Sequence, residues 1–585
     1  MKSSNTEEFK KLSLIQMLET SARNYSDQVC IYYHRDNRLV GINYRELENQ
    51  AKAFARGLIE LGVKKGDRIG ILSENRPEWG ISYFGILLTG GIVLPLDPCL
   101  KSSELKHIIR EAKAKMVIAS AKFISDLKEI SDSLSFPQKI ICMGQLSQEE
   151  LITFSQVLRA GDESEKNLHY PQTDEVASVI FTSGTTGSSK GVVLTHKNII
   201  SCIYGLQEVV DFSSKDNFLS VLPLHHAFEC TCGFLTPISR GAKITFARSL
   251  KSKELLEDMK NSRATIMLGV PLLFEKMLTS ILRAVKKRPV FVRGLFKANL
   301  GVAKFFKKAF GVNFGKSLFG GLREKAGLSN IYLFICGGAP LDPQVGKDFE
   351  HLGIKFLQGY GLTETSPVLT VNPEKKPKHA SVGIPLPGIE LEILNPDKNG
   401  VGEIAVRGDG VMPGYYDNEK ATKEVFRDGW FLTGDSGWVD KDGYYYIVGR
   451  LKSVIVTRAG KNVYPEEIEN VLNESPFILE SLVLGRPTQD GKGEEPYAII
   501  VPDYDYFDLT AEKEQIAFDE TKIEKTIKSE IVKICAEIAD YKRIKGFEIR
   551  EEEFEKTTTK KIKRYLYDHK VVRVSTDGSA DGSTD

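Results

Sequence analysis

The chain has 585 residues, and a prior of about 150 residues per folding unit gives roughly four units, or fewer if some are large. Hydrophobic residues make up 41% of the chain and charged residues 27%, which excludes an intrinsically disordered protein. The 79 Lys and Arg residues exceed the 78 Asp and Glu residues by one. A net charge of +1 gives no global electrostatic basis for binding nucleic acid, so we expect no nucleic-acid partner.

The cysteines and the longest apolar run indicate the cellular setting. Eight cysteines are too few for a disulfide scaffold in so long a chain, and none of their spacings is typical of a metal site. The run 85–94 contains Thr89 and a glycine pair and stops at Pro95, short of the roughly 18 apolar residues that span a bilayer. The N-terminal residues lack the apolar core of a signal peptide. We expect a cytoplasmic protein, with peripheral contact at the inner face of a membrane left open.

Over the first 380 or so residues, helical patterns alternate with short apolar runs. A helical spacing over 104–113 is followed by the apolar strand 116–119. Several of the later runs end in glycine-rich turns, and such alternation predicts parallel sheets covered by helices, with ligands bound beyond the carboxyl ends of the strands. The later runs lie at 178–182, 218–222, 264–268, 331–336 and 354–357.

From about residue 388 the pattern changes. Apolar and polar residues alternate over 389–394 and 402–407, which is typical of half-exposed antiparallel strands. A third region, from about residue 450, mixes strands with helices near 466–472 and 521–539. We therefore predict an α/β protein with a large N-terminal domain of helix-covered parallel sheets, a small β-barrel-like part and a small α+β C-terminal domain. The predicted boundaries are 1–450, 451–574 and a disordered tail at 575–585, which has no bulky apolar residue.

The most informative motif is the stretch 181–191, Phe-Thr-Ser-Gly-Thr-Thr-Gly-Ser-Ser-Lys-Gly, which directly follows a predicted buried strand. Glycines let a backbone curl tightly and present N–H groups inward, while hydroxyls and Lys190 supply further donors and positive charge. This composition suits a polyphosphate. The usual P-loop pattern would require Gly at 189 and Ser or Thr at 191, where this chain has Ser189 and Gly191. A bland surface loop rarely follows a buried strand and ends in an isolated lysine.

Two further stretches have side chains that suit a nucleotide. In 357–365, Leu-Gln-Gly-Tyr-Gly-Leu-Thr-Glu-Thr, the ring of Tyr360 can stack on a base and Glu364 can hold a divalent metal near phosphates. By itself this stretch is equally consistent with a core tyrosine and a solvated acid. The stretch 428–435 ends in Asp435, and an Asp in a tight turn can accept hydrogen bonds from both hydroxyls of a ribose.

The stretch 428–435 is followed by 442–450, Asp-Gly-Tyr-Tyr-Tyr-Ile-Val-Gly-Arg. Together and in this order, the motifs resemble those of the adenylate-forming superfamily, which includes acyl-CoA synthetases, 4-coumarate ligases, luciferases and peptide-synthetase adenylation domains. The resemblance runs from about residue 6 to 566 and implies a mobile C-terminal domain, ATP as the nucleotide and Mg²⁺ held by Glu364 and Thr182. Ser189 stands where the family commonly has proline. The residues that the resemblance assigns to nucleotide binding are Thr182, Ser183, Gly184, Thr185, Thr186, Gly187 and Lys190 for the phosphates, Gly338, Ala339, Pro340, Gly359, Tyr360, Gly361 and Thr363 for the adenine side, and Asp435 and Arg450 for the ribose.

The resemblance also assigns roles near the C-terminus. Lys452 falls at the hinge about which the small domain swings, and Gly460 lies in the loop that faces the acyl site when the thiol of CoA arrives. The stretch 556–564, Lys-Thr-Thr-Thr-Lys-Lys-Ile-Lys-Arg, resembles the catalytic-lysine motif, usually Pro-Lys-Thr-x-Thr-Gly-Lys-Ile. Alignment by the isoleucine makes Lys561 the catalytic residue and leaves Lys560 as the alternative. The usual proline is replaced by Glu555 and the usual glycine by Lys560.

The substrate is indicated by the stretch 220–229, Ser-Val-Leu-Pro-Leu-His-His-Ala-Phe-Glu, which looks most like long-chain fatty acyl-CoA synthetases. The resemblance places His226 beside the acyl carboxylate as a positioning residue, and it leaves His225 unassigned. The segment 280–325 interleaves twelve basic residues and one acid with seven phenylalanines. Such a segment can rest on an anionic membrane, each Lys or Arg near the surface contributing about 1 kcal/mol. A solvated helical insertion with inward phenylalanines is equally consistent with the pattern.

The resemblance implies ATP-dependent activation of a long-chain fatty acid through an acyl-adenylate to acyl-CoA, with release of AMP and pyrophosphate. CoA is then the second substrate, and an acyl carrier protein is the alternative acceptor. A further alternative is a pseudoenzyme that binds the nucleotide without catalysing adenylation, because the 555–561 motif is altered. Activation of an amino acid would need an acid near His226 to meet the ammonium, and the segment 224–234 offers only Glu229, which makes this alternative unfavourable.

Overall fold

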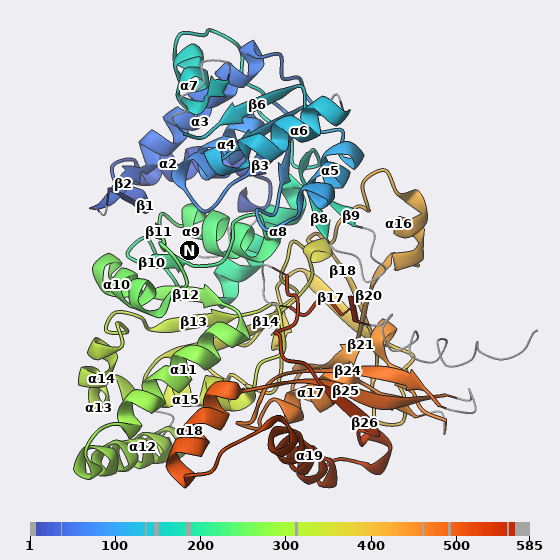
Figure 1. The fold of residues 1–585 in the computed structure, drawn as a ribbon. Coiled ribbons are helices and arrows are strands. Elements are labelled where there is room, and N and C mark those ends of the chain that lie inside the picture. Colours follow the sequence, from blue (N-terminus) through green and yellow to red (C-terminus); the bar gives the residue numbers. More distant parts are fainter. Residues whose placement is uncertain are drawn as a thin grey trace, which may run out of the picture. The chain divides into compact units, whose positions relative to one another are not determined.

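The computed structural model describes residues 8–36, 38–134, 137–144, 151–182, 189–310, 314–458, 461–488, 493–557, 561–564 and 566–567 (Figure 1). The chain divides into two compact units. The first contains the described residues from 8 to 391 together with 406–431, and the second contains 392–405 and the described residues from 432 onward. The predicted tail, 575–585, lies outside the described residues.

The first unit contains a seven-stranded sheet with the order β7-β6-β5-β3-β4-β8-β9, parallel except for the antiparallel pair β8 and β9. One face packs against α3 and α4 and the other against α5 and α6 (Figure 1). Burial on both faces explains the uninterrupted apolar runs of the strands. The strands are β3 (Arg68–Leu72), β4 (Ile92–Pro95), β5 (Met116–Ala119), β6 (Lys139–Cys142), β7 (Ile152–Thr153), β8 (Val176–Thr182) and β9 (Lys190–Thr195). The helices of this part are α2 (Leu14–Tyr25), α3 (Tyr44–Glu60), α4 (Pro77–Leu88), α5 (Ser102–Glu111), α6 (Ile124–Leu134) and α7 (Phe154–Asp162).

A nine-stranded sheet in the same unit has the order β16-β15-β14-β13-β12-β10-β11-β1-β2. Its central strands are parallel, and α10, α11 and α15 pack on one face while α8 and the π-helix η2 pack on the other. The strands are β1 (Val29–Arg35), β2 (Arg38–Asn43), β10 (Asn217–Ser220), β11 (Lys243–Phe246), β12 (Ile266–Gly269), β13 (Leu333–Cys336), β14 (Lys355–Tyr360), β15 (Thr370–Val371) and β16 (Ile384–Pro385). The helices are α8 (His196–Val209), η2 (Glu229–Leu235), α9 (Thr236–Ser239), α10 (Ser252–Ser262), α11 (Pro271–Lys286), α12 (Val290–Phe310), α13 (Gly315–Leu318), α14 (Gly320–Lys325) and α15 (Pro343–His351).

A five-stranded sheet follows in sequence, with the order β17-β18-β20-β19 and with β21 paired to β20. The pairs β19–β20 and β20–β21 are antiparallel, as the alternating pattern predicts. This sheet is the small β part of the predicted fold. Its strands are β17 (Ile389–Leu394), β18 (Gly402–Gly408), β19 (Phe426–Arg427), β20 (Trp430–Val439) and β21 (Tyr445–Arg450), and α16 (Glu419–Val425) lies within the same stretch.

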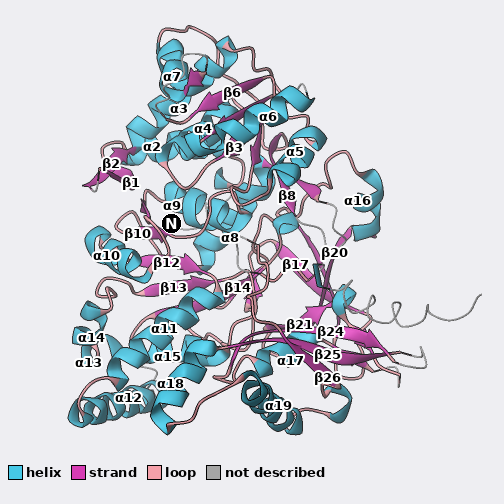
Figure 2. Cartoon of the chain, viewed as in Figure 1, coloured by secondary structure: helices cyan, strands magenta, loops and turns pink. Residues whose placement is uncertain are grey.

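The C-terminal part of the second unit is α+β, as predicted (Figure 2). The antiparallel pair β24 and β25 is extended by the parallel strand β26, and α17, α18 and α19 share one core with this sheet. Its elements are β22 (Ile455–Val456), β23 (Asn462–Val463), α17 (Pro465–Leu472), β24 (Ile478–Pro487), β25 (Glu494–Pro502), α18 (Tyr504–Glu514), α19 (Glu520–Ala536) and β26 (Gly546–Ile549). Within the described residues, no helix is both long and apolar enough to cross a membrane.

Candidate active site

The nine-stranded sheet brings three predicted motifs to one edge. β10, β12, β13 and β14 are neighbouring parallel strands, so their carboxyl ends face the same side. The stretch 221–226 leaves β10, the stretch 337–340 leaves β13, and the stretch 359–363 forms the end of β14 and the turn after it. Ligands of open parallel sheets bind at this edge. The residues predicted for the adenine side and for the acyl carboxylate therefore lie at neighbouring strand ends.

Two glycines at this edge are needed for the backbone path. Gly338 has a φ of +89°, in the left-handed region that disfavours other residues. A Cβ at Gly361 would lie 2.0 Å from the carbonyl oxygen of Pro367, which excludes any side chain there. Both glycines belong to the stretches predicted to face adenine, and at Gly361 the backbone packs directly against the backbone of Pro367.

The predicted phosphate loop joins β8 to β9, and the residues Thr182 and Lys190 are opposite each other in the hairpin. Ser183, Gly184, Thr185, Thr186 and Gly187 lie outside the described residues. The Lys190 Nζ lies 5.0 Å from the ring centroid of Tyr415, whose hydroxyl donates to Glu364 Oε1 at 3.0 Å. Within the first unit, Lys190 thus contacts Tyr415, and Tyr415 contacts the predicted metal-binding carboxylate of Glu364.

Tyr415 is a residue that the sequence analysis missed. It is held in place by backbone contacts to β9, where the N–H of Tyr416 donates to Gly191 O at 2.7 Å and the N–H of Val193 donates to Gly414 O at 3.2 Å. Thr182, predicted as a second metal ligand, has its Oγ1 3.5 Å from the carbonyl oxygen of Lys190, and its role as a ligand stays a prediction. A half-buried carboxylate held by one phenol suits a hard cation such as Mg²⁺.

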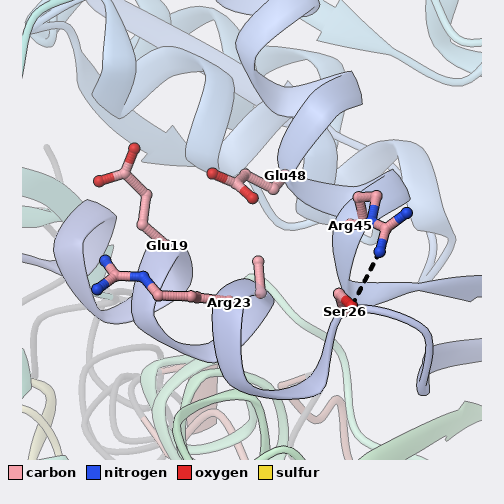
Figure 3. A pocket seen from close by; sticks show the side chains of 6 residues that line it. Glu19, Arg23, Ser26, Arg45 and Glu48 are labelled. Carbon is pink, nitrogen blue, oxygen red and sulfur yellow. Dashed lines mark hydrogen bonds between the residues drawn. The ribbon is translucent and has the colours of Figure 1, made fainter.

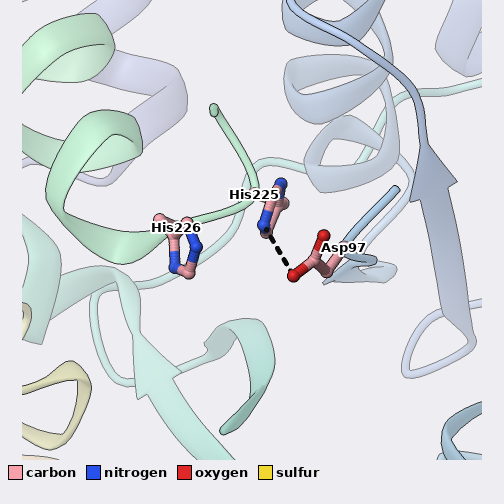
Figure 4. Close-up of side chains that lie close together, drawn as sticks. All are labelled: Asp97, His225 and His226. Atoms are coloured by element: carbon pink, nitrogen blue, oxygen red, sulfur yellow. Dashed lines mark ion pairs between the residues drawn. The ribbon is translucent and has the colours of Figure 1, made fainter. Parts of the chain in front are cut away.

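The second part of the site joins the two sheets of the first unit (Figure 4). His225, which is buried, places its Nε2 3.5 Å from Asp97 Oδ2, a contact that becomes an ion pair when the imidazole is protonated. His226 lies beside it, with ring centroids 4.3 Å apart. One ligand-type atom from each of these three side chains lies within 4.8 Å of the others, so the group could also hold a transition-metal ion. The sequence placed only His226 at the acyl carboxylate and left out Asp97.

Asn75, which follows β3, fixes the segment that carries the two histidines. Its Nδ2 donates to Ser220 Oγ at 3.1 Å and to Leu222 O at 2.7 Å, and its Oδ1 accepts from the N–H of Leu224 at 2.9 Å. These hydrogen bonds occupy the side chain of Asn75 on both its donor and acceptor atoms. The position of His225 and His226 therefore depends on a residue that is some 150 positions earlier in the chain.

Glu229 begins the π-helix that follows the histidines, and its side chain is fully buried. Burial raises the pKa of this carboxyl to about 8, and Ser220, which lowers it, does not compensate. Among the described residues no hydrogen bond of good geometry reaches either carboxyl oxygen. Gly233 leaves the space that the carboxyl fills, because a Cβ there would lie 2.6 Å from the carboxyl carbon. Glu229 is therefore a neutral acid at physiological pH.

In the second unit, the predicted ribose-binding residues face each other across two strands. Asp435 on β20 is paired in register with Arg450 at the end of β21, and Arg450 Nε lies 2.6 Å from Asp435 Oδ1. The carboxylate is almost fully buried while the arginine is 40% exposed. Thr433 Oγ1 accepts from the N–H of Asp435 at 3.1 Å, and Asp435 lies within strand β20 and not in the tight turn that the sequence predicted. Lys452, the predicted hinge, is exposed in a short 3₁₀ turn directly after β21.

The predicted lysine motif lies at the C-terminal end of the described chain. Lys561 is exposed. The N–H of Thr557 donates to Lys561 O at 2.8 Å, and the N–H of Lys561 donates to Thr557 Oγ1 at 3.2 Å. Lys556 forms ion pairs with Glu480 and Glu553. Burial lowers the pKa of Lys556, but these two partners outweigh it and raise it. Lys560 and Gly460 lie outside the described residues, so the choice between Lys560 and Lys561 stays a prediction.

A pocket of about 470 Å³ opens elsewhere, between α2 and α3 (Figure 3). Glu19, Arg23, Arg45 and Glu48 line it, and Lys52 pairs with both glutamates. None of the predicted site residues lines this pocket. Its charged walls suit neither an acyl chain nor an adenine ring, so it is separate from the candidate site.

Comparisons with known proteins agree with the motifs. The sequence model of the AMP-binding enzyme family matches residues 18–416, and that of the AMP-binding enzyme C-terminal domain matches 467–561. The long-chain-fatty-acid–CoA ligase FadD15 of Mycobacterium bovis is 30% identical over 472 residues, covering 78% of this chain and 77% of the relative. The chloroplastic long-chain-fatty-acid–[acyl-carrier-protein] ligase AEE15 of Arabidopsis thaliana is 28% identical over 542 residues, covering 80% and 74%. The structure of the anthranilate CoA ligase AuaEII with anthranoyl-AMP matches in fold, with a TM-score of 0.76 at 22% identity over 97% of this chain and 98% of the other.

Proposed function

Since the chain belongs to the family of AMP-binding enzymes and is an adenylate-forming ligase, we propose that it joins a long-chain fatty acid to CoA at the expense of ATP. The observation that carries the acyl part of the proposal is the similarity to FadD15 over 78% of this chain. The sequence 220–229, which resembles that of long-chain synthetases, supports the same substrate.

In the first half-reaction a carboxylate oxygen of the fatty acid attacks the α-phosphorus of ATP. The bond from that phosphorus to the bridging oxygen breaks, which yields the acyl-adenylate and pyrophosphate. Such chemistry depends mainly on positioning and on neutralising charge. Lys190 supplies positive charge at the base of the phosphate loop, and Tyr415 orients the Glu364 carboxylate. Bound Mg²⁺ would add charge neutralisation, and Glu364 is the residue that would hold it.

The acyl carboxylate would be positioned by His226. Its neighbour His225 contacts Asp97, and Asn75 binds the preceding residues of the same segment, both from the seven-stranded sheet. Asp435 would bind the ribose hydroxyls, and the ion pair with Arg450 orients its carboxylate. Lys561 would stabilise the charge that develops on the α-phosphate. These roles follow the resemblance of the motifs, and the contacts named here support them.

In the second half-reaction the CoA sulfur attacks the acyl carbonyl carbon, the bond to the AMP oxygen breaks, and the thioester and AMP leave. Rotation about Lys452 would withdraw Lys561 and bring the loop with Gly460 to the acyl carbonyl. Two chemically different steps then share one acyl pocket, which is the use of a movable domain.

An acyl carrier protein is the second candidate acceptor, and the similarity to AEE15 over 80% of this chain favours it specifically. Amino-acid activation is disfavoured by Glu229. Its carboxyl is fully buried, and its raised pKa keeps it neutral, so it offers no negative charge to a substrate ammonium.

A competition assay tests the substrate. The purified chain is incubated with ATP, Mg²⁺, CoA and an equimolar mixture of short, medium and long saturated fatty acids, and the acyl-CoA products are identified by mass spectrometry. The proposal predicts that long-chain products dominate. Dominance of short acyl-CoA products would reject the long-chain substrate. Replacing CoA by a phosphopantetheinylated carrier protein in a parallel reaction decides between the two acceptors, since the faster thioester formation identifies the natural one.

A further inference from the structure

Helix α12 and the turn before it carry a charge pattern that the rest of the chain does not share. From Lys276 to Arg323 the chain has twelve Lys and Arg residues and no Asp or Glu, although the net charge of the whole protein is only +1. In α12 itself, Arg293, Lys297 and Lys304 form no ion pair with any described residue. Uncompensated positive charge is therefore concentrated on α11, α12 and the turn between them.

The inward face of α12 is packed on the first unit. Ala303 is 1% exposed, and Phe296 and Leu300 pack against the same cluster. Phe296 meets Phe319 with ring centroids 5.4 Å apart. Lys307 is anchored to the buried Glu350 of α15. The helix is thus fixed on this unit by one of its faces.

The opposite face of α12 is also apolar, and it is exposed. Phe291 and Leu300 are nine residues apart, which is two and a half helical turns and places them on opposite sides. The outward side chains at helical spacing are Phe291, Leu295, Val302 and Phe305, with exposed fractions between 42% and 81%. The hypothesis that the phenylalanines of this segment pack inward therefore holds for Phe296 and Phe319 and fails for Phe291 and Phe305.

The start of the helix combines both features. Lys286, Lys287 and Arg288 lie at the end of α11 and are exposed, and Val290 and Phe291 follow with exposed fractions of 73% and 81%. A large exposed apolar surface on a folded unit marks a contact site. The cores of protein–protein interfaces are depleted in Lys, whereas helices that lie on anionic bilayers combine Lys and Arg with Phe and Leu.

We propose that the surface formed by residues 286–297, Val302 and Phe305 docks the protein on an anionic lipid bilayer. Phe291 and Leu295 enter the interface between headgroups and acyl chains, and Lys287, Arg288 and Lys297 meet lipid phosphates through their long side chains. The helix lies on the membrane and does not cross it. The proposal rests on exposure and charge and is independent of the acyl substrate.

Vesicle co-sedimentation of the full chain tests it. The probes are phosphatidylcholine vesicles with and without phosphatidylglycerol, at low and high salt. Strong binding to the anionic vesicles at low salt is expected. The double variant Lys287→Gln/Arg288→Gln should bind about 30-fold more weakly, since each cation near the surface contributes roughly fivefold. The variant Phe291→Ser/Leu295→Ser should also lose binding.

Matched controls come from α19, where Lys525→Gln/Lys528→Gln removes two exposed cations and Val532→Ser removes an exposed apolar side chain. These controls should bind like the unmodified chain. Phe291→Trp adds a direct readout, because its fluorescence should shift to the blue on anionic vesicles and be quenched by brominated lipid.

Three results would overturn the proposal: no binding by the unmodified chain, equal losses in the α12 and α19 variants, or an unquenched tryptophan in the Phe291→Trp variant. Sedimentation velocity tests whether this surface instead binds a second copy of the chain. A dimer that Phe291→Ser/Leu295→Ser converts to monomer would assign the surface to self-association instead.

Discussion

Replacing Glu229 by Gln should stabilise the protein, and increasingly so as the pH rises. The carboxyl at this position is fully buried with no hydrogen-bond partner of good geometry among the described residues, and burial raises its pKa to about 8. An unfolded Glu has an ordinary pKa near 4.5. Between these two values the unfolded chain loses a proton that the folded chain keeps, so the free energy of unfolding falls as the pH rises. Glutamine has nearly the same shape and does not titrate.

The size of the effect follows from the two pKa values. For each pH unit between them, the free energy of unfolding of the unmodified chain falls by about 1.4 kcal/mol. This deficit in stability is roughly 3 kcal/mol at pH 7 and about 5 kcal/mol at pH 8 and above. Below pH 4.5 both states hold the proton and the deficit vanishes. The unfolding free energies of the Glu229→Gln variant and the unmodified chain should therefore converge at low pH and separate steadily up to pH 8.

Urea unfolding at a series of pH values measures this difference. Trp79 is a built-in probe, because it belongs to the same core cluster as Phe234 of the π-helix, with ring centroids 6.0 Å apart. In the background Trp430→Phe/Trp438→Phe it is the only tryptophan of the chain. Glu208→Gln, an exposed change on α8, is the matched control and should leave the midpoint unchanged at every pH.

The result that would refute this reasoning is a stability difference between the Glu229→Gln variant and the unmodified chain that does not change with pH. A constant difference would mean that the carboxyl has the same pKa in both states and is solvated or ion-paired in the native protein. It would also remove the argument against amino-acid activation, which depends on a neutral acid at this position.

Three further changes test the proposed site. Lys561→Ala should abolish pyrophosphate release from ATP and fatty acid but spare thioester formation from supplied acyl-adenylate; if Lys560→Ala shows this phenotype instead, the alignment is off by one. Tyr415→Phe should raise the Mg²⁺ concentration for half-maximal activity about tenfold, because the Glu364 carboxylate loses its hydrogen bond, and an unchanged Mg²⁺ titration would remove Tyr415 from the site. Asp435→Asn should raise the KM for ATP at least about tenfold, and an unchanged KM would contradict ribose binding.

Local sequence patterns predicted most of the fold. The expected strands 116–119 and 389–394 coincide with β5 and β17, and the expected helix 466–472 lies within α17. These elements are specified by short-range periodicity, which is why the sequence was sufficient. The antiparallel pairing of β9 with β8 was not anticipated, since a strand after a glycine-rich loop shows no local sign of its pairing direction.

The site was predictable only where motifs are contiguous. The stretches at 337–340 and 359–363 meet because parallel neighbouring strands end at one edge, which the alternation predicted. Asp97, Asn75 and Tyr415 were missed because their partners are 51 to 149 positions away in sequence. Asp97 had one available signal, an acid two residues after the buried apolar strand of 92–95. The two faces of α12 likewise required the packing of Phe296 and Ala303 to be known.

The measurement that tests the central claim most directly is AMP release by the purified chain with ATP, Mg²⁺ and palmitate, with and without CoA. Strong AMP release that depends on CoA, accompanied by palmitoyl-CoA, is the predicted result. AMP release that only a phosphopantetheinylated carrier protein accelerates would move the second acceptor to first place. No AMP with any fatty acid and either acceptor would contradict the account and make the substitutions at Glu555 and Lys560 the reason for a chain that binds the nucleotide without turning it over.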